Sequence, residues 1–187
     1  MPKIYIDQGH NPENPNAGAV GNGLREQDVT YRVGQDLAAL LRRSGNWEVR
    51  LSRPTPETLL GTSNASSLRA RVDDANSWGA DYFISIHTNA SDNANASGVE
   101  AFAYSRPSRA FILGEDIVDN IVAITGQRNR GMKTRPGLYV LKKTNMPAVL
   151  VEIGFITNPG DAAIMRDNPE LFARGIYNGI VEYTGIS

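Results

Sequence analysis

The sequence predicts a three-layer α/β/α domain with a mixed, mostly parallel central sheet. Short apolar runs typical of strands alternate along the chain with longer segments of helical period, which is the pattern of an α/β protein. The run Ala148–Val151 is apolar on both faces, as expected for a buried central strand. With 187 residues, 41% of them hydrophobic and 21% charged, the chain has the size and composition of one globular domain.

The strands are expected where β-branched, aromatic and other apolar residues form short runs. These runs are Lys3–Asp7, Trp47–Ser52, Tyr82–His87, Val99–Tyr104 and Ala148–Gly154. The short apolar segment Leu138–Leu141 is a further candidate strand.

The first helix is expected over Glu26–Ser44, between the first two strands. Its apolar residues recur at helical spacing and form one buried stripe, made of Val29, Val33, Leu37, Leu40 and Leu41. Gly45 is suited to end this helix, because glycine adopts the left-handed conformation of a helix C-terminus at little cost.

Three further helices and one short one are expected downstream. Leu68–Ser77 forms the second helix, and a third is marked by Ala110, Leu113, Ile117, Ile121 and Ile124. Asn158–Pro159 opens a short helix. In the last helix Asn168 is predicted as the N-cap and Pro169 as the first residue, ahead of Phe172, Ile176, Ile180 and Tyr183. Loops are expected over Asn11–Gly23, Pro54–Ser67 and Asn89–Ser97.

Composition excludes several classes of function. The 19 Lys and Arg residues against 20 Asp and Glu give a net charge of −1, which argues against a nucleic-acid partner. The absence of cysteine excludes thiol nucleophiles, cysteine-bound zinc, iron–sulfur clusters and disulfides. No stretch approaches the roughly 18 apolar residues of an integral membrane segment, and Met1–Asp7 lacks the apolar core of a signal peptide. Without internal repeats or a compositional break, residues 1–187 are expected to form a single domain.

The two histidines occupy informative positions. His10 follows the first predicted strand, and His87 ends the third. In open α/β sheets, ligands bind beyond the carboxyl ends of the strands, where loops and helix N-termini converge. We therefore expect both imidazoles at one edge of the sheet.

Two carboxylates are predicted to project toward the same edge. Glu152 ends the buried strand, where a charge is costly unless it is paired, hydrogen-bonded or near a metal. Glu26 lies on the inward stripe of the first helix, in the turn nearest the end of the first strand. Taken singly, Glu26 could be a first-turn carboxylate that the helix dipole stabilises, and Glu152 could pair with a buried Arg53 or Arg71.

Taken together, these four groups have the composition of a catalytic zinc site. Such sites use three protein ligands of the histidine and carboxylate type and leave one position for water, so the fourth group is free to act as a base. The spacing of the four groups matches no local metal-binding motif, and spacing alone leaves structural roles open for each.

Ordered sequence blocks along nearly the whole chain carry a resemblance. The blocks are Ile6–His10, Leu24–Glu26, Leu51–Arg53, Ala75–Asn76, Ala80–Asp81, Phe83–Asn89, Gly98–Glu100, Arg130–Gly131, Leu138–Leu141 and Met146–Asn158. In these blocks the sequence resembles the type-3 family of zinc-dependent N-acetylmuramoyl-L-alanine amidases, which cleave bacterial peptidoglycan. Gln8 stands where that family often has Pro, and Thr88 where it often has Ala.

The resemblance implies a function and a role for each group. His10, Glu26 and His87 look like ligands of one Zn²⁺, and Glu152 looks like the catalytic carboxylate. The implied reaction is hydrolysis of the amide bond between N-acetylmuramic acid and L-alanine at the bacterial cell wall, after secretion or after release during lysis or sporulation. We expect a monomer with a single catalytic domain and no appended wall-binding domain.

Two other functions remain open at this point. A zinc peptidase acting on peptidoglycan stem peptides would use the same four groups, whereas a non-catalytic wall-binding module would not need a base beside an open metal position. Asp7 or Asn89 is predicted to orient the histidine rings. Glu100 is predicted to be structural, facing outward or packing against an arginine. A basic group could contact stem-peptide carboxylates or form a solvated face, and comprises Arg128, Arg130, Lys133, Arg135, Lys142 and Lys143.

Overall fold

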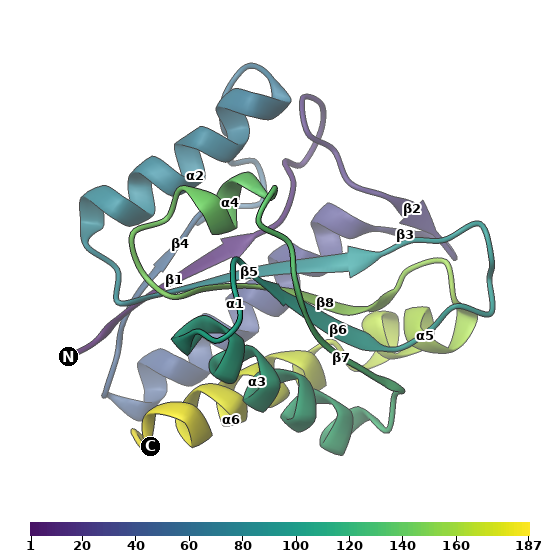
Figure 1. The fold of residues 1–187 in the computed structure, drawn as a ribbon. Coiled ribbons are helices and arrows are strands. Elements are labelled where there is room, and N and C mark those ends of the chain that lie inside the picture. The colour runs from purple at the N-terminus through teal and green to yellow at the C-terminus, as the bar shows by residue number, and fades with distance from the viewer.

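The computed structural model describes residues 1–187 and confirms the predicted architecture. A six-stranded sheet of order β4-β1-β5-β8-β6-β7 lies between helical layers (Figure 1). Its strands are β1 (Lys3–Gln8), β4 (Glu48–Leu51), β5 (Tyr82–Asn89), β6 (Val99–Ala103), β7 (Asn129–Thr134) and β8 (Ala148–Phe155). Neighbouring strands are parallel except for β6 and β8, which are antiparallel, so the sheet is mixed and mostly parallel.

The helices cover both faces of the sheet, as Figure 1 shows. One face carries α1 (Glu26–Ser44), α3 (Arg109–Thr125) and α6 (Glu170–Thr184), and the other carries α2 (Asn64–Trp78) and α4 (Tyr139–Lys142). Helix α5 (Pro159–Asp167) follows β8, and a small antiparallel pair, β2 (Val20–Gly21) with β3 (Leu24–Arg25), precedes α1. No helix combines the length and apolar character that a bilayer crossing requires.

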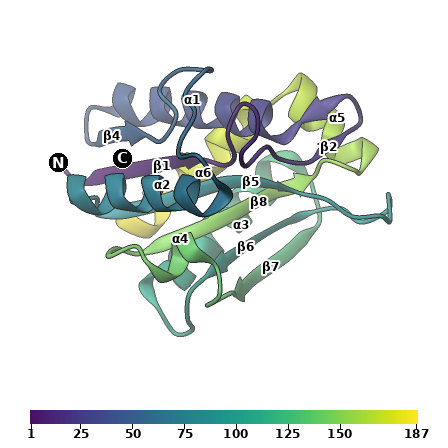
Figure 2. The same ribbon diagram turned by 90° about the horizontal axis from the view of Figure 1, so that it is seen from above.

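The alternation of side chains along the strands separates two apolar cores. Ile84 and Ile86 of β5 belong to the larger core under α1, α3 and α6, whereas Phe83 belongs to the smaller core under α2 and α4. His87 lies on the same side of β5 as Phe83, and Glu152 lies on the same side of β8 as Leu150, which also belongs to the smaller core. Both residues therefore lie on the face of the sheet that α2 covers. Figure 2 views the molecule from above, with α2 and α4 in front of the strands.

The predicted strand Leu138–Leu141 is wrong, because this segment forms helix α4. The amides of Leu141 and Lys142 both donate to the carbonyl of Leu138, which closes a helical turn. A run of about four apolar residues has no periodicity that distinguishes a strand from a buried helical turn. Strand β7 went unpredicted because it is an edge strand in which Met132 is the lone aliphatic residue.

Two helix starts differ from the prediction. Helix α2 begins at Asn64 rather than Leu68, because Ser63 caps it. The Ser63 side chain accepts from the amide of Ser66, and the Ser66 side chain accepts from the amide of Ser63. Helix α6 begins at Glu170 with Pro169 at the N-cap, so Asn168 does not cap it. The Asn158 cap of α5 is confirmed, because its side chain accepts from the amide of Asp161.

Helices α3 and α6 pack backbone against backbone. A Cβ on Gly179 would lie 2.5 Å from the Cα of Ile117, and a Cβ on Gly175 would lie 2.6 Å from the Cα of Ile121. Both distances are below contact distance, so the two glycines set the separation of the helices.

Gly179→Ala is therefore expected to lower stability by about 1–3 kcal/mol, because an added methyl group must push two packed helices apart. The measurement is the midpoint of thermal unfolding. Arg174→Ala serves as the control, since Arg174 is exposed on the same helix. An unchanged midpoint for Gly179→Ala would show that α6 moves without cost.

Candidate active site

The candidate site lies where the carboxyl ends of the central strands meet the start of α1. His87 and Glu152 are neighbours across the parallel pair of β5 and β8 and therefore share a face of the sheet. His10 follows β1, and Glu26 is the first residue of α1. The structure thus brings together the four groups that the sequence analysis singled out.

His10, Glu26 and His87 form a compact cluster of metal-ligand type. The Oε1 atom of Glu26 lies 3.2 Å from Nε2 of His10 and 3.2 Å from Nδ1 of His87. One atom from each side chain lies within 4.8 Å of the others. Burial by itself would raise the pKa of Glu26, but hydrogen bonds with the two imidazoles outweigh it and hold the pKa far below its ordinary range.

The backbone around the cluster is shaped to hold these side chains. Glu26 accepts from the amide of Ala19 at Oε2 (2.9 Å) and from the amide of Thr88 at Oε1 (3.0 Å). A Cβ on Gly9 would lie 2.5 Å from Cε1 of His87, and a Cβ on Gly18 would lie 2.8 Å from Oε2 of Glu26. Glycine at both positions therefore lets the chain close around the histidine ring and the carboxylate.

The donor set fits a zinc ion. Two imidazole nitrogens and one carboxylate oxygen, supplied by three separate segments of the chain, are the ligands that catalytic zinc sites use. The three side chains lie close enough for one ion to reach them all, and the small residues behind them leave the ligands room.

Glu152 completes the site as an unpartnered acid. Its Oε2 atom is buried and has no hydrogen-bond partner. The pKa of this carboxyl is raised to about 7, chiefly by burial and further by the negative charges of Glu26 and Glu100. The positive charges of His87 and Arg135 act in the opposite direction. The alternative pairing of Glu152 with Arg53 or Arg71 is wrong, because both arginines bond elsewhere.

Comparison with known proteins identifies the family. The family model described as N-acetylmuramoyl-L-alanine amidase matches residues 4–182. The chain is 37% identical to the N-acetylmuramoyl-L-alanine amidase CwlM of Bacillus licheniformis over 100% of this chain and 70% of that protein. The chain belongs to the N-acetylmuramoyl-L-alanine amidase family.

Other members of the amidase family agree in sequence and in fold. The chain is 36% identical to LytC of Bacillus subtilis, over 96% of this chain and 35% of that protein. The catalytic domain of the amidase CwlV from Bacillus (Paenibacillus) polymyxa superposes with a TM-score of 0.87 at 29% identity, with 100% of both chains covered. The CwlD amidase from Clostridioides difficile gives a TM-score of 0.90 at 26% identity, again over 100% of both chains.

Glu100 of this amidase-family chain lies beside Glu152, in register across β6 and β8. It forms ion pairs with Lys133 and Arg130, and its Oε1 accepts from Nδ2 of Asn89 at 2.7 Å. The prediction that Glu100 packs against an arginine is thus confirmed, with Lys133 as an added partner.

The predicted partners of the histidine rings are wrong. Nδ1 of His10 lies 3.2 Å from the carbonyl oxygen of Asn16, and Nδ1 of His87 faces Glu26. Asn89 bonds to Glu100 instead. Asp7 accepts from Arg71 and Ser85.

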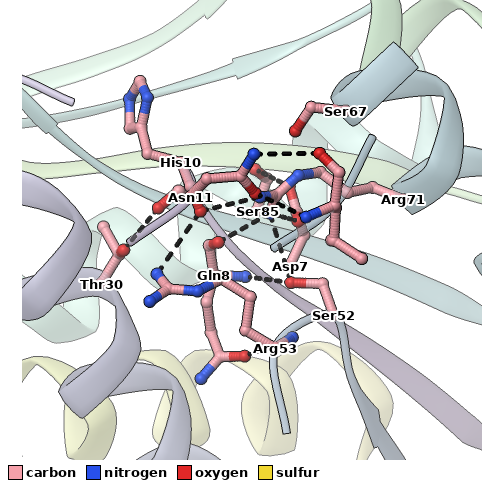
Figure 3. A network of polar contacts seen from close by, with 12 residues as sticks. Asp7, Gln8, His10, Asn11, Thr30, Ser52, Arg53, Ser67, Arg71 and Ser85 are labelled. Atoms are coloured by element: carbon pink, nitrogen blue, oxygen red, sulfur yellow. Dashed lines mark hydrogen bonds and ion pairs between the residues drawn. The ribbon is translucent and has the colours of Figure 1, made fainter. Parts of the chain in front are cut away.

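Arg71, which the sequence analysis considered only as a partner of Glu152, holds the loop that carries His10 (Figure 3). Arg71 Nη1 donates to Asp7 Oδ1 and to the carbonyl of Gln8, both at 2.7 Å, and Nη2 donates to the carbonyl of His10 at 2.7 Å. These bonds hold His10 at a φ of 69°, in the left-handed region. The signal was its spacing: Arg71 occurs four residues after the buried Ser67 and four before the buried Ala75.

Arg71→Met should cost roughly 3–5 kcal/mol of stability, because it leaves Asp7 buried without its countercharge. Asp7→Leu combined with Arg71→Met should recover much of that loss while zinc affinity stays weakened, since the carbonyls of Gln8 and His10 still lack their donor. Denaturant unfolding and zinc titration check the two effects. Arg69→Met, on the exposed side of α2, is the matched control.

The difference between wild type and Arg71→Met should also depend on pH. Burial would raise the pKa of Asp7, but the charge and hydrogen bond of Arg71 hold it below its ordinary value of 3.8. In the wild type this stabilisation is lost as the pH falls below about 4 and Asp7 takes up a proton, whereas in Arg71→Met the buried, unpaired Asp7 takes up its proton at higher pH. The difference in stability is therefore smallest at low pH and grows as the pH rises through both pKa values. A difference that stays constant down to low pH would contradict the assigned ion pair.

Proposed function

We propose that the chain hydrolyses the amide bond between N-acetylmuramic acid and L-alanine in bacterial peptidoglycan, using one Zn²⁺ bound by His10, Glu26 and His87. The observation that carries the proposal is the cluster of three donor side chains within 4.8 Å, beside an acid whose Oε2 atom is buried and unpartnered, in a chain of the amidase family. No other cluster of ionisable side chains in the structure has this ligand composition.

The chain's own residues have distinct roles in this proposal. Bound zinc would make water more acidic and polarise a carbonyl group. His10, Glu26 and His87 hold the ion from three different segments, which fixes its position relative to the sheet. Glu152 takes a proton from the attacking water and returns it to the departing amine of L-alanine. A pKa of about 7 suits a carboxyl group that must do both.

We further propose that residues 1–187 act as one catalytic unit, as a monomer, at the bacterial cell wall. Relatives support this location. They include a sporulation-specific amidase of Bacillus subtilis, 33% identical, and an endolysin of Bacillus phage SPP1, 29% identical. Secretion and release during lysis or sporulation are both compatible with these relatives.

The two carboxylates should separate metal binding from catalysis. Glu26→Gln should lower zinc occupancy because it removes a charged ligand, whereas Glu152→Gln should retain about one zinc and lose roughly 10²–10⁴-fold in turnover. Elemental analysis of the purified variants and hydrolysis of peptidoglycan are the two measurements. Glu57→Gln is the control, because Glu57 is an exposed carboxylate that does not belong to the cluster.

Two results would overturn these roles. Full activity of the wild type after zinc removal would exclude zinc as the cofactor. Loss of zinc from Glu152→Gln with retention in Glu26→Gln would show that the roles of the two carboxylates are exchanged.

The bond that is cut distinguishes the proposed activity from its alternatives. Digestion of purified peptidoglycan should leave new L-alanine amino termini and intact glycan strands, as read by amino-terminal labelling and mass spectrometry. New termini between stem residues would indicate a zinc peptidase, and new reducing ends would indicate a glycosidase. Binding without any hydrolysis would indicate a wall-binding module.

A further inference from the structure

The basic side chains near Glu152 differ in whether they have a carboxylate partner. Lys133 and Arg130 both pair with Glu100, and Arg130 also donates to the carbonyl of Ser97. Arg135 is exposed and forms no ion pair with any carboxylate of the chain. Its positive charge is therefore available to a group from outside the molecule.

Arg135 is nevertheless held in place. Its amide donates to the carbonyl of Ala103 at 2.9 Å, which extends the pairing of β6 with β7 by one residue. Its guanidinium carbon lies 5.1 Å from the centre of the Phe102 ring. A guanidinium held over an aromatic ring can still offer N–H groups to an anion, and it gives up little further freedom when it binds one.

The register places Arg135 on the same face as the candidate site. Glu100 is in register with Glu152, and Phe102 lies two positions farther along β6 with the same parity. Diagonal neighbours on two adjacent antiparallel strands lie about 7–8 Å apart. Phe102 lies opposite Leu150 and is therefore such a diagonal neighbour of Glu152, displaced toward the amino-terminal end of β8, and the Arg135 guanidinium lies over its ring.

This separation matches the size of a peptide. Two residues of an extended chain span at most about 7 Å. If the amide that is cut lies at Glu152, a stem peptide that runs across β8 and β6 brings its second residue to the Phe102 ring. A carboxylate on that residue would meet the N–H groups of the guanidinium, where two parallel N–H···O bonds can form.

We propose that Arg135, stacked on Phe102, binds the carboxylate of the second stem-peptide residue and so makes the enzyme selective for acidic over amidated peptides. This inference rests on the proposed function, because the amide bond at Glu152 sets the position of the peptide. Arg135 contributes binding, and the chemical step remains with Glu152.

The test uses two soluble muropeptides that differ in a single group: the second residue carries either a free carboxylate or its primary amide. With zinc-loaded protein, Arg135→Gln should raise the KM for the carboxylate substrate by about tenfold and change that for the amide by less than about twofold. Arg135→Lys should fall between, since an ammonium retains the charge without the planar fork. Arg128→Gln is the matched control, because Arg128 is also exposed but precedes β7.

A binding measurement separates recognition from turnover. In the Glu152→Gln background, calorimetric titration should show the same selective loss of affinity on adding Arg135→Gln, and added salt should reduce the preference for the carboxylate. Equal effects on both muropeptides, or none on either, would overturn the inference while leaving the proposed function intact. If the zinc-loaded wild type cleaves neither muropeptide nor peptidoglycan, the proposed function fails, and the inference fails with it.

Discussion

The ion pair of Arg71 with Asp7 is the constraint on which the site depends. Both side chains are almost inaccessible to water, with 1% and 2% of their surface exposed. Charges so deeply buried are tolerated only when most of their hydrogen-bonding capacity is satisfied. Arg71 meets this condition by donating to the backbone that follows β1, so the cost of burying it is offset by bonds that fix the loop carrying His10.

The ion pair also orders the neighbouring elements. Asp7 accepts from Ser85 on β5, and Ser52 after β4 accepts from the amide of Gln8. A network of polar contacts therefore connects three adjacent strands with α2 at the edge where the proposed zinc ligands converge (Figure 3). An enzyme site gains from such rigidity, because groups that are held beforehand need no reorganisation during the reaction.

Three carboxylates lie near one another at this edge, and each is compensated differently. Glu26 is bonded to two imidazoles and two amides, and Glu100 is paired with two cations. Glu152 has no such partner at Oε2. Since these environments lower the pKa of the first two and raise that of the third, the same side-chain chemistry suits three different roles: the proposed ligand, a structural anion and the proposed proton carrier.

The sequence by itself determined the α/β class, the main strands and the convergence of His10, His87 and Glu152, because these depend on apolar runs and on which residue ends each run. The role of Arg71, the strand β7 and the helix α4 were decided by tertiary structure. Arg71 can be buried and hold the loop that carries His10 only because the buried Asp7 lies opposite it. A polar edge strand and a four-residue turn owe their form to neighbours distant in sequence, which local periodicity does not encode.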